Sequence, residues 1–76
     1  MDLLPSQCRA ARALLNWTQA ELAEKAGVAV NTVKFFEKGE RMPQAANRAK
    51  LRSVIEAAGV DFIDRGNGGP GARLRG

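Results

Sequence analysis

Apolar residues near the start of the chain follow a helical spacing. Cys8, Ala11 and Leu15 recur at intervals of three and four residues, so they fall on one face of a helix. Pro5 precedes them, and proline is well tolerated in a first helical turn. The pattern predicts a helix that begins near Pro5 and ends near Asn16.

The next segment carries stronger boundary signals. Thr18 followed by Glu21 forms a capping box, in which each side chain satisfies a backbone N–H at the start of a helix. Gly27 supplies the left-handed conformation that commonly ends one. The inward face of this second helix is predicted to consist of Leu22, Ala23 and Ala26.

Only the tripeptide "VAV" separates Gly27 from a third helical segment, predicted at residues 31–38. The two helices must therefore turn sharply against each other. Val33 and Phe36 lie three residues apart and are expected to face the core, and Gly39 ends the helix. The other sides carry Asn31, Lys34, Phe35 and Lys38.

A fourth helix is predicted from Pro43 to Ala58, because proline favours the first helical turn and Gly59 follows as a terminator. Its apolar stripe consists of Leu51, Ile55 and Ala58, with Val54 beside it. Its basic side chains are Arg48, Lys50 and Arg52. We interpret them as a solvated face, with a binding surface as the alternative.

Beyond the fourth helix the pattern changes to strict alternation. The two sides of "VDFID" carry Val60 and Phe62, and Asp61 and Ile63. With "RGNGGPG" and "ARLR" after it, this segment predicts a β-hairpin of two short strands and a Gly-rich loop. An isolated hairpin is marginally stable in water, so it must pack on the helices or on a second copy of the chain. The alternative is a tail without regular structure after residue 65.

Together these elements describe an all-α domain of four helices at residues 1–59, followed by a short β-hairpin at residues 60–76. A chain of 76 residues buries only about 60% of its unfolded surface, so it has room for one small core. Aromatic residues make up only 5% of the chain. The core is therefore expected to be mainly aliphatic, which favours helices.

The chain carries 12 basic and 8 acidic residues and a net charge of +4. This balance suits a polyanionic partner, although it also fits a merely solvated surface. The chain has no histidine and a single cysteine, Cys8, so neither a metal site with nitrogen or sulfur ligands nor an internal disulfide is expected. We interpret Cys8 as a core residue rather than a reactive thiol. Without a long apolar run or a signal peptide, a cytoplasmic protein is expected.

Two short helices joined by a turn that contains glycine are the elements of a helix-turn-helix. The segment "TQAELAEKAGVAVNTVKFFEKGERMP" closely resembles the helix-turn-helix of the phage repressor and Cro family, also called the XRE family. The resemblance covers about residues 6–60. It implies a lambda-repressor-like fold and a transcriptional regulator, most simply a repressor, that binds double-stranded DNA without a cofactor.

The resemblance also assigns roles to individual positions. Gln19 matches a residue that typically meets a DNA phosphate, and Glu37 and Gly39 match the Glu-x-Gly that closes the recognition helix. In some relatives an arginine of the first helix pairs with that glutamate, and the matching residue here is Arg12. The alternative is that Glu37 lies in solvent. The turn matches Ala26, Gly27 and Val28, and the Thr-aliphatic pair of the recognition helix matches Thr32 and Val33.

The chain departs from the family pattern at several positions. Ala29 replaces the Ser or Thr that usually caps the recognition helix, at a cost of about 1 kcal/mol. Val30 and Phe35 match positions that are frequently polar base readers. Arg48 stands where a leucine is common, which leaves the packing of the first turn of the fourth helix open.

The predicted DNA contacts follow from placing the recognition helix in the major groove. Asn31 is the candidate for two hydrogen bonds to adenine, and Lys34 for a guanine or a phosphate. Val30 and Phe35 are candidates for contact with a thymine methyl group, although Phe35 equally fits a core or dimer position. The predicted phosphate contacts, which fix register without reading sequence, are Gln19, Thr32, Lys38, Arg41 and Arg12.

One such module covers few base pairs, so a homodimer on two half-sites about one helical turn apart is expected. The hairpin is the candidate dimer element, through its strand edges or through Phe62, Ile63 and Leu74. The last helix is the alternative interface.

No enzyme is expected, because the chain has no histidine and its carboxylates are scattered among basic residues. The segment "GNGGPG" lacks the Lys-Ser/Thr of a phosphate loop, and no small-molecule substrate is evident. The alternative function is a protein-interaction role, for example that of an antitoxin whose helix-turn-helix domain binds a toxin and regulates its own operon.

Overall fold

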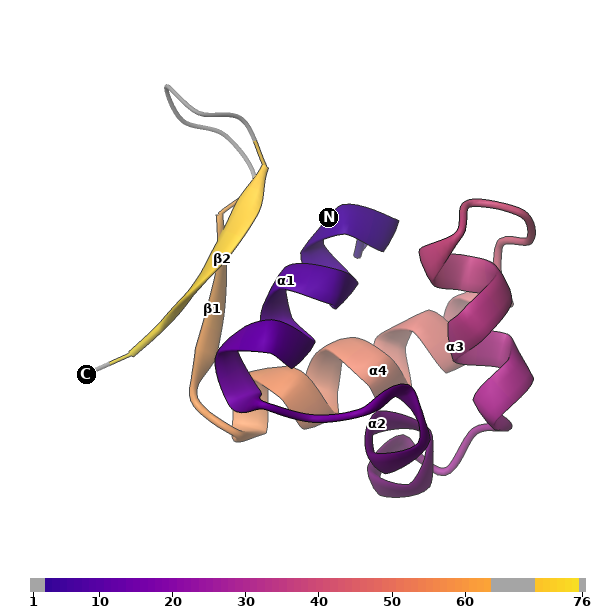
Figure 1. Ribbon diagram of the computed structural model, residues 1–76, viewed down its shortest axis with the longest axis horizontal. Helices are drawn as coiled ribbons and strands as arrows, with labels where there is room; N and C mark the ends of the chain where they lie inside the picture. The colour runs from indigo at the N-terminus through magenta and orange to yellow at the C-terminus, as the bar shows by residue number, and fades with distance from the viewer. Residues whose placement is uncertain (1–2, 64–69, 76) are drawn as a thin grey trace.

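The structure, a computed structural model, describes residues 3–63 and 70–75. Its elements are, in order, α1 (Pro5–Leu15), α2 (Gln19–Ala26), α3 (Val30–Glu37), α4 (Ala45–Ala57), β1 (Val60–Ile63) and β2 (Gly71–Leu74). The four helices enclose one core, and the hairpin lies beside α1 at the end of the molecule away from α3 (Figure 1). The predicted fold class, four helices with a short C-terminal hairpin, is confirmed.

Most helix ends lie where the sequence signals them. Thr18 and Glu21 form the predicted capping box, in which each side chain accepts a 3.0 Å hydrogen bond from the backbone N–H of the other. Gly27 ends α2 in the left-handed region at φ 71°, and Asn16 ends α1 at φ 59°. The N-cap of α3 is Ala29, which has no side chain to accept a hydrogen bond, as the sequence predicted.

The bounds of α3 and α4 differ from the predictions by one or two residues. α3 begins and ends one residue earlier than expected, at Val30 and Glu37. α4 begins at Ala45, because Gln44 is extended (φ −56°, ψ 151°) and leaves Pro43 in the preceding loop. Ala58 was expected on the apolar stripe of α4, but it is the C-cap of that helix and is exposed.

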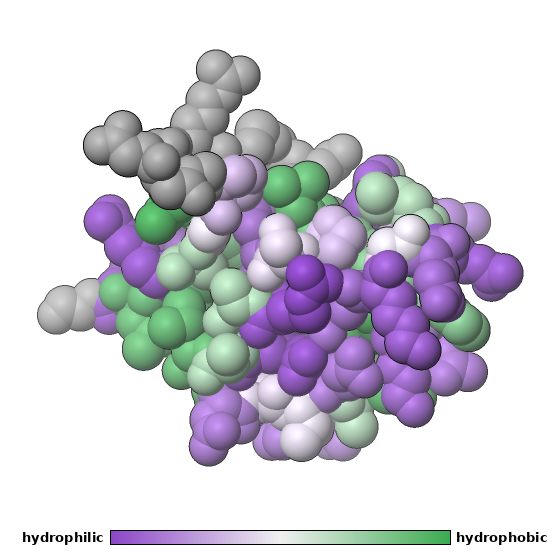
Figure 2. All heavy atoms as spheres, turned by 45° about the horizontal axis from the view of Figure 1, so that its top comes forward, coloured by the Kyte–Doolittle hydropathy of each residue, from purple (hydrophilic) through white to green (hydrophobic). Residues whose placement is uncertain are grey.

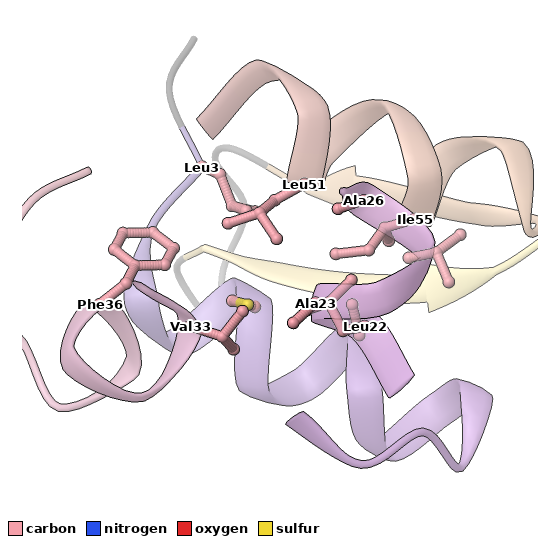
Figure 3. Close-up of a cluster of buried hydrophobic side chains, with 11 residues drawn as sticks. Leu3, Leu22, Ala23, Ala26, Val33, Phe36, Leu51 and Ile55 are labelled. Atoms are coloured by element: carbon pink, nitrogen blue, oxygen red, sulfur yellow. The ribbon is translucent and has the colours of Figure 1, made fainter. Parts of the chain in front are cut away.

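Each element contributes its apolar face to one core (Figure 3). Val33 and Phe36 of α3 point into the space between the helices, toward the side chains of α2 and α4. Burial of a side chain of this size contributes about 1.5–3 kcal/mol, so the core anchors α3 through its inner side. The buried apolar residues are Leu3, Cys8, Ala11, Leu22, Ala23, Ala26, Val33, Phe36, Leu51, Ile55 and Val60.

The two strands form an antiparallel pair in which Val60 lies opposite Leu74 and Phe62 opposite Ala72. Val60 is buried, and Phe62 and Ala72 pack against the core. The alternative of an unstructured tail is wrong for residues 71–74, which form β2. Most of the predicted Gly-rich loop lies outside the described residues.

Gln7 of α1 connects the hairpin to the helices. It is fully buried, and its Nε2 donates to the backbone carbonyls of Ile63 at 3.2 Å and Gly71 at 3.3 Å. Its Oε1 accepts a hydrogen bond from the backbone N–H of Leu4 at 3.0 Å. Since Ile63 and Gly71 lie opposite each other, one side chain holds both strands against the start of α1.

Candidate nucleic-acid interface

The two sides of α3 differ in exposure as the sequence predicted. Val33 and Phe36 face inward with 0% and 1% of their surface exposed. Asn31, Lys34, Phe35 and Lys38 are exposed. The helix lies at the edge of the molecule, so its outer side faces solvent (Figure 1).

Glu37, at the C-terminal end of α3, is buried with 3% of its surface exposed. Arg12 of α1 donates two hydrogen bonds of 2.7 Å to its carboxylate, from Nε to Oε2 and from Nη2 to Oε1. Gln19 of α2 donates from Nε2 to Oε1 at 3.0 Å, and the Cys8 thiol donates to Oε2 at 3.1 Å. The expected Arg12–Glu37 ion pair is therefore present, and the alternative of a solvent-exposed Glu37 is wrong.

The charge state of this cluster follows from its contacts. Burial by itself raises the pKa of Glu37, but the hydrogen bonds from Arg12, Gln19 and Cys8 outweigh it and hold that pKa below its ordinary value. The same bond to Glu37 raises the pKa of Arg12. Burial, and then the bond to Glu37, raise the pKa of the Cys8 thiol. Cys8 therefore stays protonated as a hydrogen-bond donor, in agreement with its interpretation as a core residue.

Further hydrogen bonds connect α1 to the link between α1 and α2 and to the C-terminal end of α3. Arg9 donates from Nη1 to the backbone carbonyl of Glu37. Arg12 donates from Nη1 to the carbonyl of Trp17 at 3.1 Å. Because a carbonyl at a helix C-terminus carries partial negative charge, the Arg9 contact stabilises the end of α3. The orientation of α3 is thus set by side chains of both preceding helices.

The residues that the sequence predicts to contact phosphates differ in their exposure. Lys38 and Arg41 are exposed, and Thr32 and Gln19 are half-buried. Arg12 uses all three of its guanidinium nitrogens in contacts to Glu37 and Trp17. The structure therefore places Arg12 in the support of α3, while Lys38 and Arg41 are accessible to a ligand.

A groove of about 360 Å³ lies between α3 and the segment that follows it. Asn31, Thr32 and Phe35 line it from α3, and the opposite side is formed by Arg41, Met42, Pro43, Gln44 and Asn47. The sequence interpretation did not include Met42, Gln44 or Asn47. Met42 and Gln44 flank Pro43 in the sequence, and a proline between two helical patterns was the available signal, but the position of these residues next to α3 depends on the fold.

The match to known proteins agrees with this geometry. A family model described as helix-turn-helix, of the XRE type, matches residues 9–59, which is more than half of the chain. The chain belongs to this helix-turn-helix family. Members of the family are DNA-binding transcription regulators. The search of curated proteins found no match.

In this helix-turn-helix protein the matched region ends before the hairpin of β1 and β2. The face drawn in Figure 2 is hydrophilic over its centre and toward the α3 side, and apolar side chains gather toward the hairpin side. Within residues 3–63 and 70–75, no acidic, histidine or cysteine cluster is placed to hold a metal ion. Over the same residues, no helix has the length and apolar character needed to cross a membrane.

Proposed function

We propose that this helix-turn-helix protein is a sequence-specific repressor that reads the major groove of a pseudo-palindromic operator as a homodimer. The main support is the way in which α3 is held. Its inner side lies in the core, its C-terminal end is tied to α1 and α2 through Glu37, and its outer side is exposed. A helix held in this way can enter the major groove without rearrangement.

In this proposal the exposed side chains divide into two groups. Asn31, in the first turn of α3, hydrogen-bonds to an adenine, and Lys34 reaches a guanine or a phosphate. Lys38 and Arg41 bind phosphates and position the protein without reading sequence. Gln19 both supports α3 and binds a phosphate. Its amide donates one hydrogen bond to Glu37 at 3.0 Å and retains a further N–H for a phosphate.

Among the described residues β2 pairs with β1 only, and its other, free edge supports the homodimer. The N–H of Arg75 donates to the carbonyl of Gly59 at 2.7 Å, so this opposing pair is hydrogen-bonded. Because hydrogen-bonded and non-hydrogen-bonded pairs alternate along an antiparallel ladder, the backbone groups of Ala72 and Leu74 point away from β1. A free edge of this kind can pair with the same edge of a second copy.

The apolar side chains of the hairpin differ in how accessible they are to a second copy of the chain. Leu74 is 51% exposed and available to a partner. Phe62 packs against the core, and the guanidinium of Arg52 lies 5.1 Å from the centre of its ring. Ile63 is half-buried, and its carbonyl accepts from Gln7. Of the three candidate dimer residues, Leu74 therefore carries the proposal.

The proposal is tested by selecting bound sequences from a random DNA pool at a stated low salt concentration. Enrichment of a palindromic sequence with two half-sites about one helical turn apart is expected. Failure to bind any DNA under these conditions would instead favour a protein-interaction role, since low salt maximises the contribution of counterion release.

The dimer is tested separately with Leu74→Pro and Leu74→Ala. Proline removes an N–H that points away from β1, so it blocks edge pairing and leaves the intramolecular ladder intact. Analytical ultracentrifugation is expected to show a monomer for Leu74→Pro and a weakened dimer for Leu74→Ala. A wild-type monomer both alone and on DNA would refute the homodimer.

A further inference from the structure

We propose that the groove between α3 and the following loop holds a thymine nucleotide of the operator, with the C5-methyl group of the base against the ring of Phe35. This inference rests on the proposed DNA binding and adds to it a ligand group and the residue that selects this group. It places the methyl-reading function at Phe35 rather than at Val30, which does not line the groove.

Phe35 forms an apolar wall at the surface of α3. Its side chain is 38% exposed, although the neighbouring Phe36 is buried in the core. Met42, which is 58% exposed, and Pro43 extend this wall across the groove. The guanidinium of Arg41 lies 5.6 Å from the centre of the Phe35 ring. An apolar surface and a cation therefore stand side by side at the edge of the proposed DNA interface.

The remaining lining of the groove matches the other parts of a nucleotide. Among the described residues that line it, Arg41 alone is charged, and its positive charge complements a phosphate. Gln44 and Asn47 contribute amides that can hydrogen-bond to phosphate or sugar oxygens. The volume of about 360 Å³ lies within the range of about 300–1,000 Å³ that is usual for ligand pockets.

The position of the groove favours a DNA strand over other occupants. Asn31 lies one helical turn before Phe35, and both residues line the groove and face outward from α3. Four residues of helix rise about 6 Å, and base pairs along B-DNA are spaced about 3.4 Å apart. Asn31 and Phe35 therefore reach bases that lie within one or two steps of each other.

The chemistry of Phe35 selects the base. A phenyl ring offers no hydrogen-bond donor or acceptor to the polar edges of the bases. In the major groove, the thymine C5-methyl group is the apolar feature that distinguishes one base from the others. With Asn31 reading an adenine, the pair selects a short element of A·T pairs in each half-site.

The proposal is tested with operator duplexes in which each thymine is replaced singly by deoxyuridine, which lacks only the methyl group. Binding is measured by fluorescence anisotropy with the full chain. One position in each half-site is expected to lose about fourfold in affinity, as burial of one methyl group implies. Phe35→Ala is expected to bind the thymine and deoxyuridine duplexes equally, and Phe35→Leu to retain part of the difference.

Leu14→Ala is the matched control, because Leu14 is 39% exposed on α1 and does not line the groove. It is expected to keep the full preference for thymine. Far-ultraviolet circular dichroism establishes that each variant is folded. Equal binding of all thymine and deoxyuridine duplexes by the wild-type chain would overturn the inference and leave the proposed function intact. A preference for thymine that persists in Phe35→Ala would also overturn the inference. Absence of DNA binding by the wild-type chain would contradict both the inference and the proposed function.

Discussion

The Arg12 guanidinium of α1 holds the buried Glu37 carboxylate of α3 through two hydrogen bonds of 2.7 Å. The two residues are 25 positions apart in the sequence, and their contact joins α1 to the C-terminal end of α3. Because Glu37 is 3% exposed, its charge is tolerated only with this partner present. The pair therefore connects the stability of the domain to the orientation of α3.

Arg12→Ala is expected to destabilise the protein by about 3 kcal/mol, because it leaves the Glu37 charge buried and without its cationic partner. Urea unfolding followed by the fluorescence of Trp17, the one tryptophan of the chain, measures the change. Asp61→Asn is the matched control, since the Asp61–Arg75 pair is exposed and is expected to contribute less than about 1 kcal/mol. Equal effects of the two substitutions would contradict this account.

Glu37 is expected to make the stability of the protein depend on acidic pH. Its pKa in the folded protein lies below the ordinary value of 4.5, so the folded state favours the ionised form. The stability that this provides is present above the unfolded pKa and is lost as the pH falls through the folded pKa. Urea unfolding from pH 7 to about pH 3 is expected to show a smaller loss for Glu37→Gln than for the wild type. Parallel curves would show that Glu37 is not a source of the acid dependence.

Gln7→Leu is expected to loosen the hairpin, because the substitution removes the donor that serves the carbonyls of Ile63 and Gly71. Loss of a buried hydrogen-bond partner costs about 1–3 kcal/mol. Hydrogen exchange measured by NMR is expected to accelerate in β1 more than in α2, because the side-chain hydrogen bonds of Gln7 go to Leu4, Ile63 and Gly71. Uniform acceleration throughout the chain would indicate global destabilisation instead.

Asn31→Ala and Lys38→Ala are expected to affect DNA binding differently. Loss of Asn31 relaxes the preference at one base pair by about 1–3 kcal/mol. Loss of Lys38 weakens binding to all sequences alike and lowers the salt dependence of the affinity by about one unit of slope. Anisotropy titrations on the selected operator and on random DNA at several salt concentrations separate the two effects. Equal losses on both DNAs for Asn31→Ala would refute its base-reading role.

The Cys8 thiol is expected to resist alkylation in the folded protein. It is 0% exposed, and burial together with the bond to Glu37 raises its pKa, so little thiolate forms. Labelling with iodoacetamide, followed by mass spectrometry, is expected to be fast only in urea concentrations that unfold the chain. Rapid labelling under native conditions would show that the α1–α3 contact opens on its own.

Much of the local structure follows directly from sequence patterns. The capping box of Thr18 and Glu21, the left-handed Gly27 and the apolar spacing of α1 to α3 depend on residues a few positions apart, whose interactions are the same in any fold. The start of α4 was predicted less accurately, because Pro43 is compatible with both a first helical turn and a preceding loop. The Arg12–Glu37 pair was expected through the family resemblance, and the charges alone did not require it.

The sequence by itself thus determined the order of the elements, most of their ends and which side of α3 faces the core, since these depend on short-range periodicity and capping. The tertiary structure alone decided that Cys8 and Gln19 join Arg12 on Glu37, that Gln7 spans both strands, and that Met42 comes to line the same groove as Phe35. These contacts link residues that are distant along the chain. Their strength comes from burial and hydrogen-bond geometry, which exist only after the helices have packed together.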